Sequence, residues 1–142
     1  MRSSSRWLVL LASPLVLQPS TAIAQHDDHG TEQAKRGLGQ SFPNALNQSL
    51  HPNWHVYEFE RDGISYYQVN DMAGRLHLIV AKAGDAFWSL PAGESGARIS
   101  LPAWPQLPHP TSVPIEVYRD SEFALILHND SNDAMWSIEL IR

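Results

Sequence analysis

Histidine and aspartate, two residue types that bind metal ions, gather in the run His26-Asp27-Asp28-His29. Imidazole nitrogens and carboxylate oxygens at this density can hold Zn, Cu or Ni. An N-terminal copper or nickel site needs histidine at the third position of the processed chain, whereas the cleavage expected below places His26 at the second. We therefore expect no cofactor, and keep His26 and His29 as candidate ligands for Zn or Cu against the simpler interpretation of a solvated tail.

The other histidines lack the spacing of a metal site. His51 and His55 are four residues apart, but Pro52 between them argues against the helix that would place both side chains on one face. His55, His77 and His128 fall in or at the end of expected strands, and nothing in their spacing shows that they converge. We expect them to be surface or hydrogen-bonded core residues.

Two patterns resemble parts of a hydrolase site. Glu58 and Glu60 share one face of an expected strand, but glycoside hydrolysis needs carboxylates on opposite sides of the substrate, so a solvated face is the better interpretation. The run Gly93-Glu94-Ser95-Gly96 lacks glycine two residues after the serine, where Ala97 stands, and is a loop rather than a nucleophile elbow. No catalytic set is complete, so we expect a non-catalytic protein.

Tryptophan and tyrosine are more informative, because both are common at contact surfaces. Tyr66 and Tyr67 are adjacent on an expected strand, so they point to opposite faces and one of them should lie on the less buried side. Trp104 lies among prolines, as a lid over the core or as an exposed anchor. Tyr66, Tyr67 and Trp104 form the predicted binding surface, while Trp88 and Trp136 are expected in the core.

The N-terminus has the pattern of an export signal. Residues 1–6 hold two arginines and no acid, residues 7–17 are apolar, and Ala22-Ile23-Ala24 supplies small residues for cleavage after Ala24. The apolar run is shorter than the roughly 20 residues that span a bilayer. We therefore expect residues 1–24 to be a cleaved signal peptide, and the protein to be periplasmic or secreted, with no membrane insertion.

The remaining chain divides by composition. Residues 25–40 read as a disordered polar arm and residues 41–52 as a short helix or loop. Residues 53–142 read as a single β domain with a proline-rich crossover at 91–114. The expected strands are 54–60, 64–70, 75–82, 86–90, 115–119, 122–128 and 134–141, and the crossover leaves room for a short one near 98–101.

Alternation of apolar residues orients the strands of the second half. Phe123, Leu125 and Leu127 share one face of their strand, and Trp136, Ile138 and Leu140 share one face of the last. Two antiparallel meanders joined by a crossing segment predict a mainly β fold. The expected form is a small antiparallel β-sandwich or a partly closed barrel of about seven strands.

The amino-acid composition excludes several kinds of site and partner. The chain of 142 residues has no cysteine, which excludes a disulfide framework, a thiolate zinc site and a cysteine nucleophile, and fits a bacterial periplasm better than an endoplasmic reticulum lumen. Its net charge of −5 argues against a nucleic-acid partner.

We expect an exported, acidic and soluble β domain that acts as a non-catalytic binding or interaction module of the cell envelope. Its partner would be a protein or an envelope component, and the sequence leaves the oligomeric state open. Two alternatives remain. One is a metal-handling protein that uses the histidine-rich arm, and the other is a small envelope hydrolase or hydrolase inhibitor.

Overall fold

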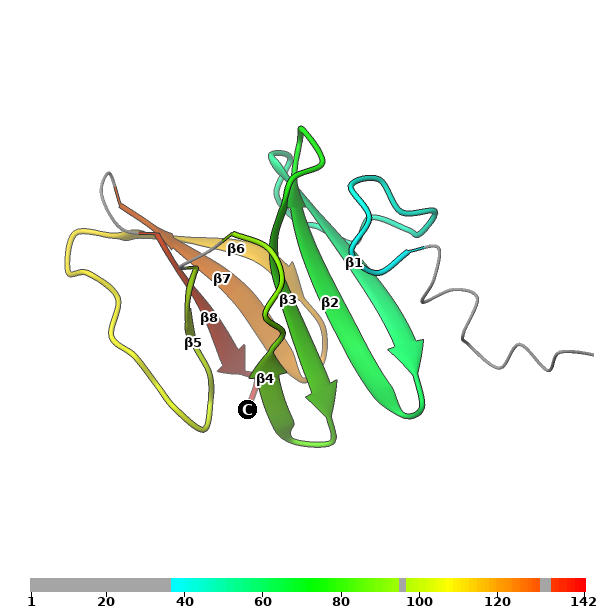
Figure 1. Cartoon of the computed structure of the whole chain (residues 1–142). Helices are drawn as coiled ribbons and strands as arrows, with labels where there is room; N and C mark the ends of the chain where they lie inside the picture. Colours follow the sequence, from blue (N-terminus) through cyan, green and yellow to red (C-terminus); the bar gives the residue numbers. More distant parts are fainter. Residues whose placement is uncertain (1–36, 95–96, 131–133) are drawn as a thin grey trace, which may run out of the picture.

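The computed structural model describes residues 37–94, 97–130 and 134–142. The predicted signal peptide, most of the polar arm, and His26 and His29 lie outside these residues. All strands and turns of the described part form one all-β fold of eight strands in two four-stranded sheets (Figure 1). The expected fold class is confirmed. The described part contains no helix with the length and apolar content needed to span a bilayer.

The first sheet is an antiparallel meander in the order β1-β2-β3-β4. Its strands are β1 (Trp54–Arg61), β2 (Ile64–Asp71), β3 (Leu76–Ala83) and β4 (Ala86–Ser89). Asp62 and Gly63 connect β1 to β2 with φ values of 54° and 75°. Positive φ at both residues is the backbone of a type I′ turn, whose twist matches that of the flanking strands.

The second sheet has the order β5-β8-β7-β6. Its strands are β5 (Arg98–Ser100), β6 (Val113–Arg119), β7 (Phe123–Asn129) and β8 (Met135–Leu140). Strands β6 to β8 form the second meander, and the short β5 joins β8 in parallel as an edge strand. Pro114 lies within β6, at the other edge of this sheet, where a missing N–H interrupts no inner ladder.

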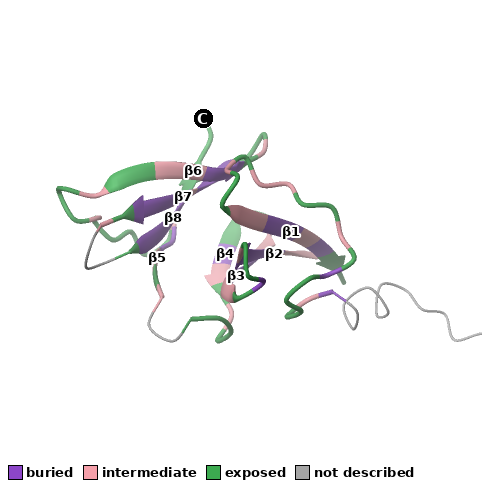
Figure 2. Cartoon of the chain, turned by 90° about the horizontal axis from the view of Figure 1, so that it is seen from above, coloured by how far each residue is buried: buried purple, intermediate pink, exposed green. Residues whose placement is uncertain are grey.

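The two sheets pack face to face and enclose one hydrophobic core. Figure 2 shows the sheets from above, with buried segments on strands of both. The predicted alternation of β7 is confirmed, since Phe123, Leu125 and Leu127 all point into the core. The buried core consists of Val56, Tyr67, Val69, Leu78, Val80 and Phe87 of the first sheet, with Leu101, Val117, Tyr118, Phe123, Leu125, Leu127, Trp136 and Ile138 of or beside the second.

Residues 37–51, which we call the strap, form no helix, so the helical option for residues 41–52 is wrong. Two fully buried amides of β2 take up the backbone hydrogen bonds that a helix would need. Gly39 N–H donates to Gln68 Oε1 at 2.6 Å, and Gln68 Nε2 donates to the carbonyl of Gln40 at 2.7 Å. Asn70 Nδ2 donates to the carbonyl of Ser41 at 2.8 Å.

The end of the strap closes one side of the sandwich. Gln48 N–H donates to the carbonyl of Val56 on β1, and Leu50 N–H donates to the carbonyl of Val117 on β6, each at 2.8 Å. These bonds link the edge strands of the two sheets, which reduces the exposed edge that other chains could pair with. They also fix the segment that carries His51 at one end of the sandwich.

Candidate functional site

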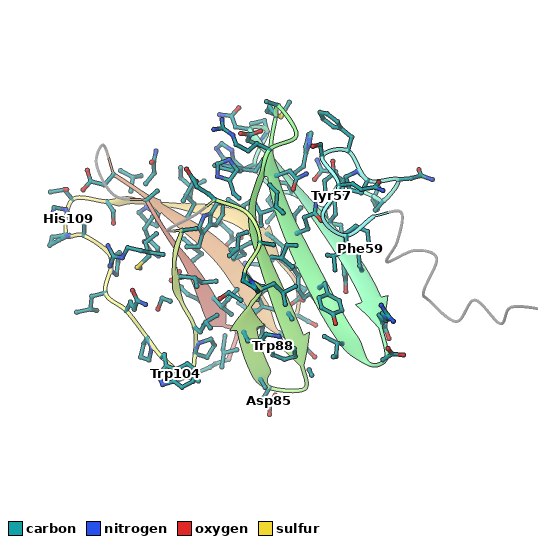
Figure 3. The ribbon with its side chains drawn as sticks, in the orientation of Figure 1. Tyr57, Phe59, Asp85, Trp88, Trp104 and His109 are labelled. Atoms are coloured by element: carbon teal, nitrogen blue, oxygen red, sulfur yellow. The ribbon has the colours of Figure 1, made fainter. Side chains whose placement is uncertain are left out.

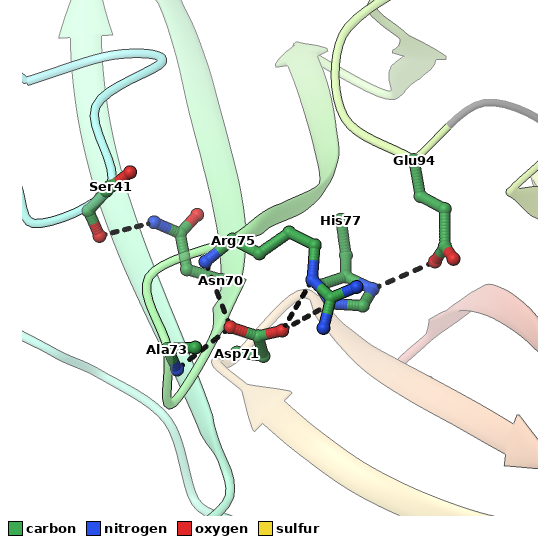
Figure 4. A network of polar contacts seen from close by, with 7 residues as sticks. All are labelled: Ser41, Asn70, Asp71, Ala73, Arg75, His77 and Glu94. Carbon is green, nitrogen blue, oxygen red and sulfur yellow. Dashed lines mark hydrogen bonds and ion pairs between the residues drawn. The ribbon is translucent and has the colours of Figure 1, made fainter.

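His77, near the start of β3, is held between two carboxylates (Figure 4). Its Nε2 lies 3.1 Å from Asp71 Oδ2, and its Nδ1 lies 3.0 Å from Glu94 Oε2. Asp71 ends β2, whereas Glu94 comes from the connection between β4 and β5. Because both ring nitrogens are engaged, the orientation of the imidazole is fixed.

Asp71 organises the turn between β2 and β3. Its Oδ1 accepts the backbone N–H of Ala73 and that of Arg75, each at 2.9 Å, and its Oδ2 accepts Arg75 Nε at 3.0 Å. The hydrogen bond from His77, followed by those from Arg75 and Ala73, holds the pKa of Asp71 well below its usual range. Asp71 therefore stays ionised and acts as a fixed acceptor for His77.

Glu94 reaches His77 because Gly93 lets the chain lie directly against β3. Gly93 has a φ of 103°, and Glu94 N–H donates to the carbonyl of His77 at 3.2 Å. A Cβ at position 93 would stand 2.5 Å from that carbonyl oxygen. The loop can therefore approach this closely only with glycine at this position.

A row of aromatic rings connects His77 to the core. The rings of Trp54 and His77 meet edge to face at 4.9 Å between centroids, and those of Trp54 and Trp136 meet edge to face at 5.1 Å. Both geometries are favourable ones for ring pairs. The row runs from β3 through β1 to β8, so it joins the two sheets at this end of the sandwich.

A hollow of about 320 Å³, which we call the end cavity, lies beside this row. Its apolar lining comes from both sheets and includes Trp54, Ile115, Leu127 and Trp136. Its polar lining consists of His51, Asn53, His77, Glu94 and Asn129. A second hollow of about 370 Å³ also touches His77 and Glu94 and extends past Leu90 toward Ile99. The His77–Glu94 pair therefore borders both hollows.

The lining of the end cavity is made of aromatic rings, aliphatic side chains, amides and one carboxylate. The described residues that line it include no serine, threonine, lysine or tyrosine that could attack a substrate. His77 has carboxylates on both nitrogens and offers neither to a substrate. The cavity thus provides fixed rings, amides and one carboxylate around a space of small-molecule size.

A second candidate surface is the loop of residues 101–112, which we call the proline loop. Trp104 and Leu107 are 76% and 89% exposed on it, so Trp104 is an exposed residue and not a lid over the core (Figure 3). Trp104 N–H donates to the carbonyl of Leu101 at 2.9 Å, and Thr111 Oγ1 donates to Asp130 Oδ2 at 2.8 Å. The loop is anchored at both ends and contains no aspartate, glutamate, lysine or arginine.

The two predicted tyrosines lie on opposite faces of β2, as expected. Tyr67 is 4% exposed and packs in the core, 5.0 Å from the ring of Phe123, so it offers no surface to a partner. Tyr66 is half-buried on the outer face of the first sheet. The proline loop that carries Trp104 connects two strands of the second sheet, so Tyr66 and Trp104 come from different sheets.

Trp88 and Glu58 also lie differently from expectation. Phe87 occupies the core position of β4, so Trp88 lies half-buried on the opposite, outer face. Glu58 is half-buried rather than solvated, and accepts hydrogen bonds from Gln48 Nε2 at 3.2 Å and from Tyr67 Oη at 3.4 Å. Glu60 is exposed, as predicted. The two glutamates therefore do not form a paired acid site.

The strand histidines do not converge. The Nδ1 atom of His55 is buried with no hydrogen-bond partner among the described residues. His128 Nε2 lies 2.9 Å from Ser137 Oγ, and Glu139 approaches the same nitrogen at 4.0 Å. A catalytic triad needs the acid on the other nitrogen, so this trio is not one. The described part of the chain holds no group of three potential metal ligands.

The sequence did not reveal the end cavity. The sequence predicts only that Trp54 and His77 lie on strands. Glu94 belongs to the run Gly93–Gly96, which does not fit a nucleophile elbow. Two features of the sequence could have indicated the His77 network. Asp71 and His77 flank a short turn, and Gly93 directly precedes an acid.

Comparison of the chain with protein-family models, with curated proteins and with solved structures finds no match.

Proposed function

We propose that the chain is an exported, non-catalytic binding module of the cell envelope that takes a small organic ligand in the end cavity. The observation that supports this most is the cavity itself, which is lined by Trp54 and Trp136 and bordered by the hydrogen-bonded pair His77 and Glu94. An apolar hollow with a few placed polar groups is the usual form of a ligand site. Export is inferred from the N-terminal signal pattern.

Rigidity of the lining favours binding. The His77 ring is held by Asp71 and Glu94, and Trp54 is held between His77 and Trp136. Side chains that are already ordered lose little conformational entropy when a ligand arrives. The polar network therefore serves to hold the aromatic wall in place.

Nuclear magnetic resonance tests this function. The indole N–H signals of Trp54 and Trp136 should shift when a library of small polar, cationic and apolar compounds is titrated into the labelled chain. Those of Trp88 and Trp104, which do not line the cavity, should stay in place. A library that moves neither Trp54 nor Trp136 would overturn the proposal.

A second candidate function is docking of an envelope protein through the proline loop. It is favoured by the exposure of Trp104 and Leu107 on an anchored loop, because tryptophan is common among the residues that dominate binding energies. Capture from envelope extract should yield a partner that is lost with Trp104→Ala. Leu46→Ala, which changes an exposed apolar residue elsewhere, is the matched control. Retention of the partner by Trp104→Ala would exclude this surface.

The metal-handling alternative depends on His26 and His29, which lie outside the described residues. Calorimetry with Zn²⁺ and Cu²⁺ should show binding that disappears when residues 26–29 are deleted. Binding that survives the deletion would exclude the arm as the metal site.

A further inference from the structure

The end cavity presents several polar atoms that no other group among the described residues binds. The side-chain amides of Asn53 and Asn129 are exposed and form no hydrogen bond within the described residues. Glu94 contacts His77 through Oε2, and its Oε1 has no hydrogen-bond partner in the part of the chain that the structure describes. His51 accepts the N–H of Asn53 on Nδ1 at 3.3 Å, and its Nε2 has no hydrogen-bond partner in residues 37–94, 97–130 and 134–142. The cavity thus offers hydrogen-bonding groups at four residues.

These groups mix donors and acceptors. Each amide both donates and accepts, and the Glu94 carboxylate accepts. Because His51 accepts a hydrogen bond on Nδ1, its Nε2–H donates. A hydroxyl group also donates and accepts, so a ligand with several hydroxyl groups satisfies this set. An anion would face the negative charges of Glu94 and Asp71, which argues against an anionic ligand.

The apolar lining fits the same class of ligand. Trp54, Trp136, Ile115 and Leu127 form a wall against which the C–H face of a sugar ring can pack. The cavity volume of about 320 Å³ is at the small end of the usual range of about 300–1,000 Å³ for ligand sites. The space therefore suits one or two sugar rings rather than a long polymer segment.

We propose that the end cavity binds a neutral mono- or disaccharide, with its hydroxyl groups on Asn53, Asn129, His51 and Glu94 and its apolar face on Trp54. This inference rests on the proposed function and names the ligand class of the same site.

The test is a magnetic resonance titration of the full chain with glucose, galactose, mannose, N-acetylglucosamine and cellobiose up to high millimolar concentration. Choline and benzyl alcohol serve as cationic and apolar comparison compounds. At least one sugar should shift the indole signals of Trp54 and Trp136. Asn53→Ala and Asn129→Ala should each raise its dissociation constant about three- to tenfold, the effect of one lost hydrogen bond. Asn44→Ala, which removes an exposed amide outside the cavity, should leave it unchanged.

The outcomes separate the two proposals. If choline or benzyl alcohol shifts Trp54 and no sugar does, the saccharide inference is overturned while the binding function stands. If no compound of any class shifts Trp54 or Trp136, both are overturned. Sugar binding that neither asparagine variant weakens would also contradict hydrogen bonding of the sugar to Asn53 and Asn129, provided that both variants keep the thermal stability of the parent chain.

Discussion

A Cβ on residue 93 would stand 2.5 Å from the carbonyl oxygen of His77, and only the absence of that atom in Gly93 lets Glu94 reach the imidazole. Gly93 thus allows the segment between β4 and β5 to lie against β3, where Glu94 joins the polar network beside the end cavity. The positive φ of 103° at Gly93 adds a second reason for glycine at this position.

Gly93→Ala is therefore expected to displace Glu94 from His77 and to lower the free energy of unfolding by about 1–3 kcal/mol. Chemical denaturation measures the stability, and the His77 ring signals report the loss of the carboxylate. Gly84→Ala is the matched control, since Gly84 has a φ of 55° but open space around its missing Cβ. Equal effects of the two substitutions would show that the close approach to His77 is unimportant.

Asp71 should make stability depend on pH in the acid range. Its pKa is lowered in the folded chain, so its contribution is complete above its unfolded pKa of about 4 and is lost as the pH falls below that value. Asp71→Asn should lower the melting temperature at neutral pH and reduce its fall on acidification. Asp85→Asn, in the exposed β3–β4 turn (Figure 3), should leave the acid profile unchanged. Identical profiles for the parent chain and Asp71→Asn would contradict this role of Asp71.

Tyr67 should make stability depend on pH in the alkaline range. Burial, with the charges of Glu58 and Asp120, raises the pKa of Tyr67 to about 12. The neutral phenol is favoured in the folded state, so its contribution is complete below about pH 10 and is lost as the pH rises toward 12. Tyr67 by itself should lower the free energy of unfolding by about 1.4 kcal/mol per pH unit in this window.

Burial also raises the pKa of Tyr118, which packs beside Tyr67 with ring centroids 5.3 Å apart. Tyrosinate absorbance should therefore show that Tyr67 and Tyr118 ionise late, together with unfolding, and burial raises the pKa of Tyr57 as well. Tyr67→Phe should make the alkaline decline in stability less steep, since Tyr118 still contributes to it. Ionisation of all tyrosines near pH 10 in the folded chain would rule out this arrangement.

The buried amides of β2 should hold the strap on the sheet. Asn70→Ala removes the hydrogen bonds that the fully buried Asn70 amide makes to Gln68 and to the carbonyls of Gln40 and Ser41, and is expected to cost about 1–3 kcal/mol. Limited proteolysis should then cut the strap first, before the β strands. Asn44→Ala, which removes an exposed amide on the same strap, should leave the cutting rate as it is. A strap that stays protected in Asn70→Ala would show that these bonds do not anchor it.

Local patterns predicted most of the fold, because strand alternation and turn residues act over a few positions. The I′ turn at Asp62 and Gly63 and the inward face of β7 follow from such patterns. The strap could not be predicted in this way, because its partners Gln68 and Asn70 are nearly thirty residues away in sequence. The candidate site could not be predicted for the same reason. Glu94 and His77 are 17 residues apart in sequence, and they meet only because Gly93 lies against the His77 backbone.

Trp88 shows how a strand face can be misassigned. In β4 the aromatic pair Phe87-Trp88 must place one ring on each face, and its sequence alone does not say which. The register places Trp88 opposite Ala81 and turns Phe87 into the core, against Phe123. For Trp104, the surrounding prolines left two positions open, a lid over the core and an exposed anchor. The structure shows the exposed position.

The most direct measurement is a ligand titration of a variant whose end cavity is filled by a larger side chain. Ala134 is exposed and lines the end cavity, so Ala134→Phe should fill the space while Ala134→Ser leaves it open. The sugar or other compound that shifts the Trp54 and Trp136 indole signals of the parent chain should also shift them in Ala134→Ser. It should no longer shift them in Ala134→Phe. Shifts of equal size in all three chains would contradict the proposal that the end cavity is the binding site.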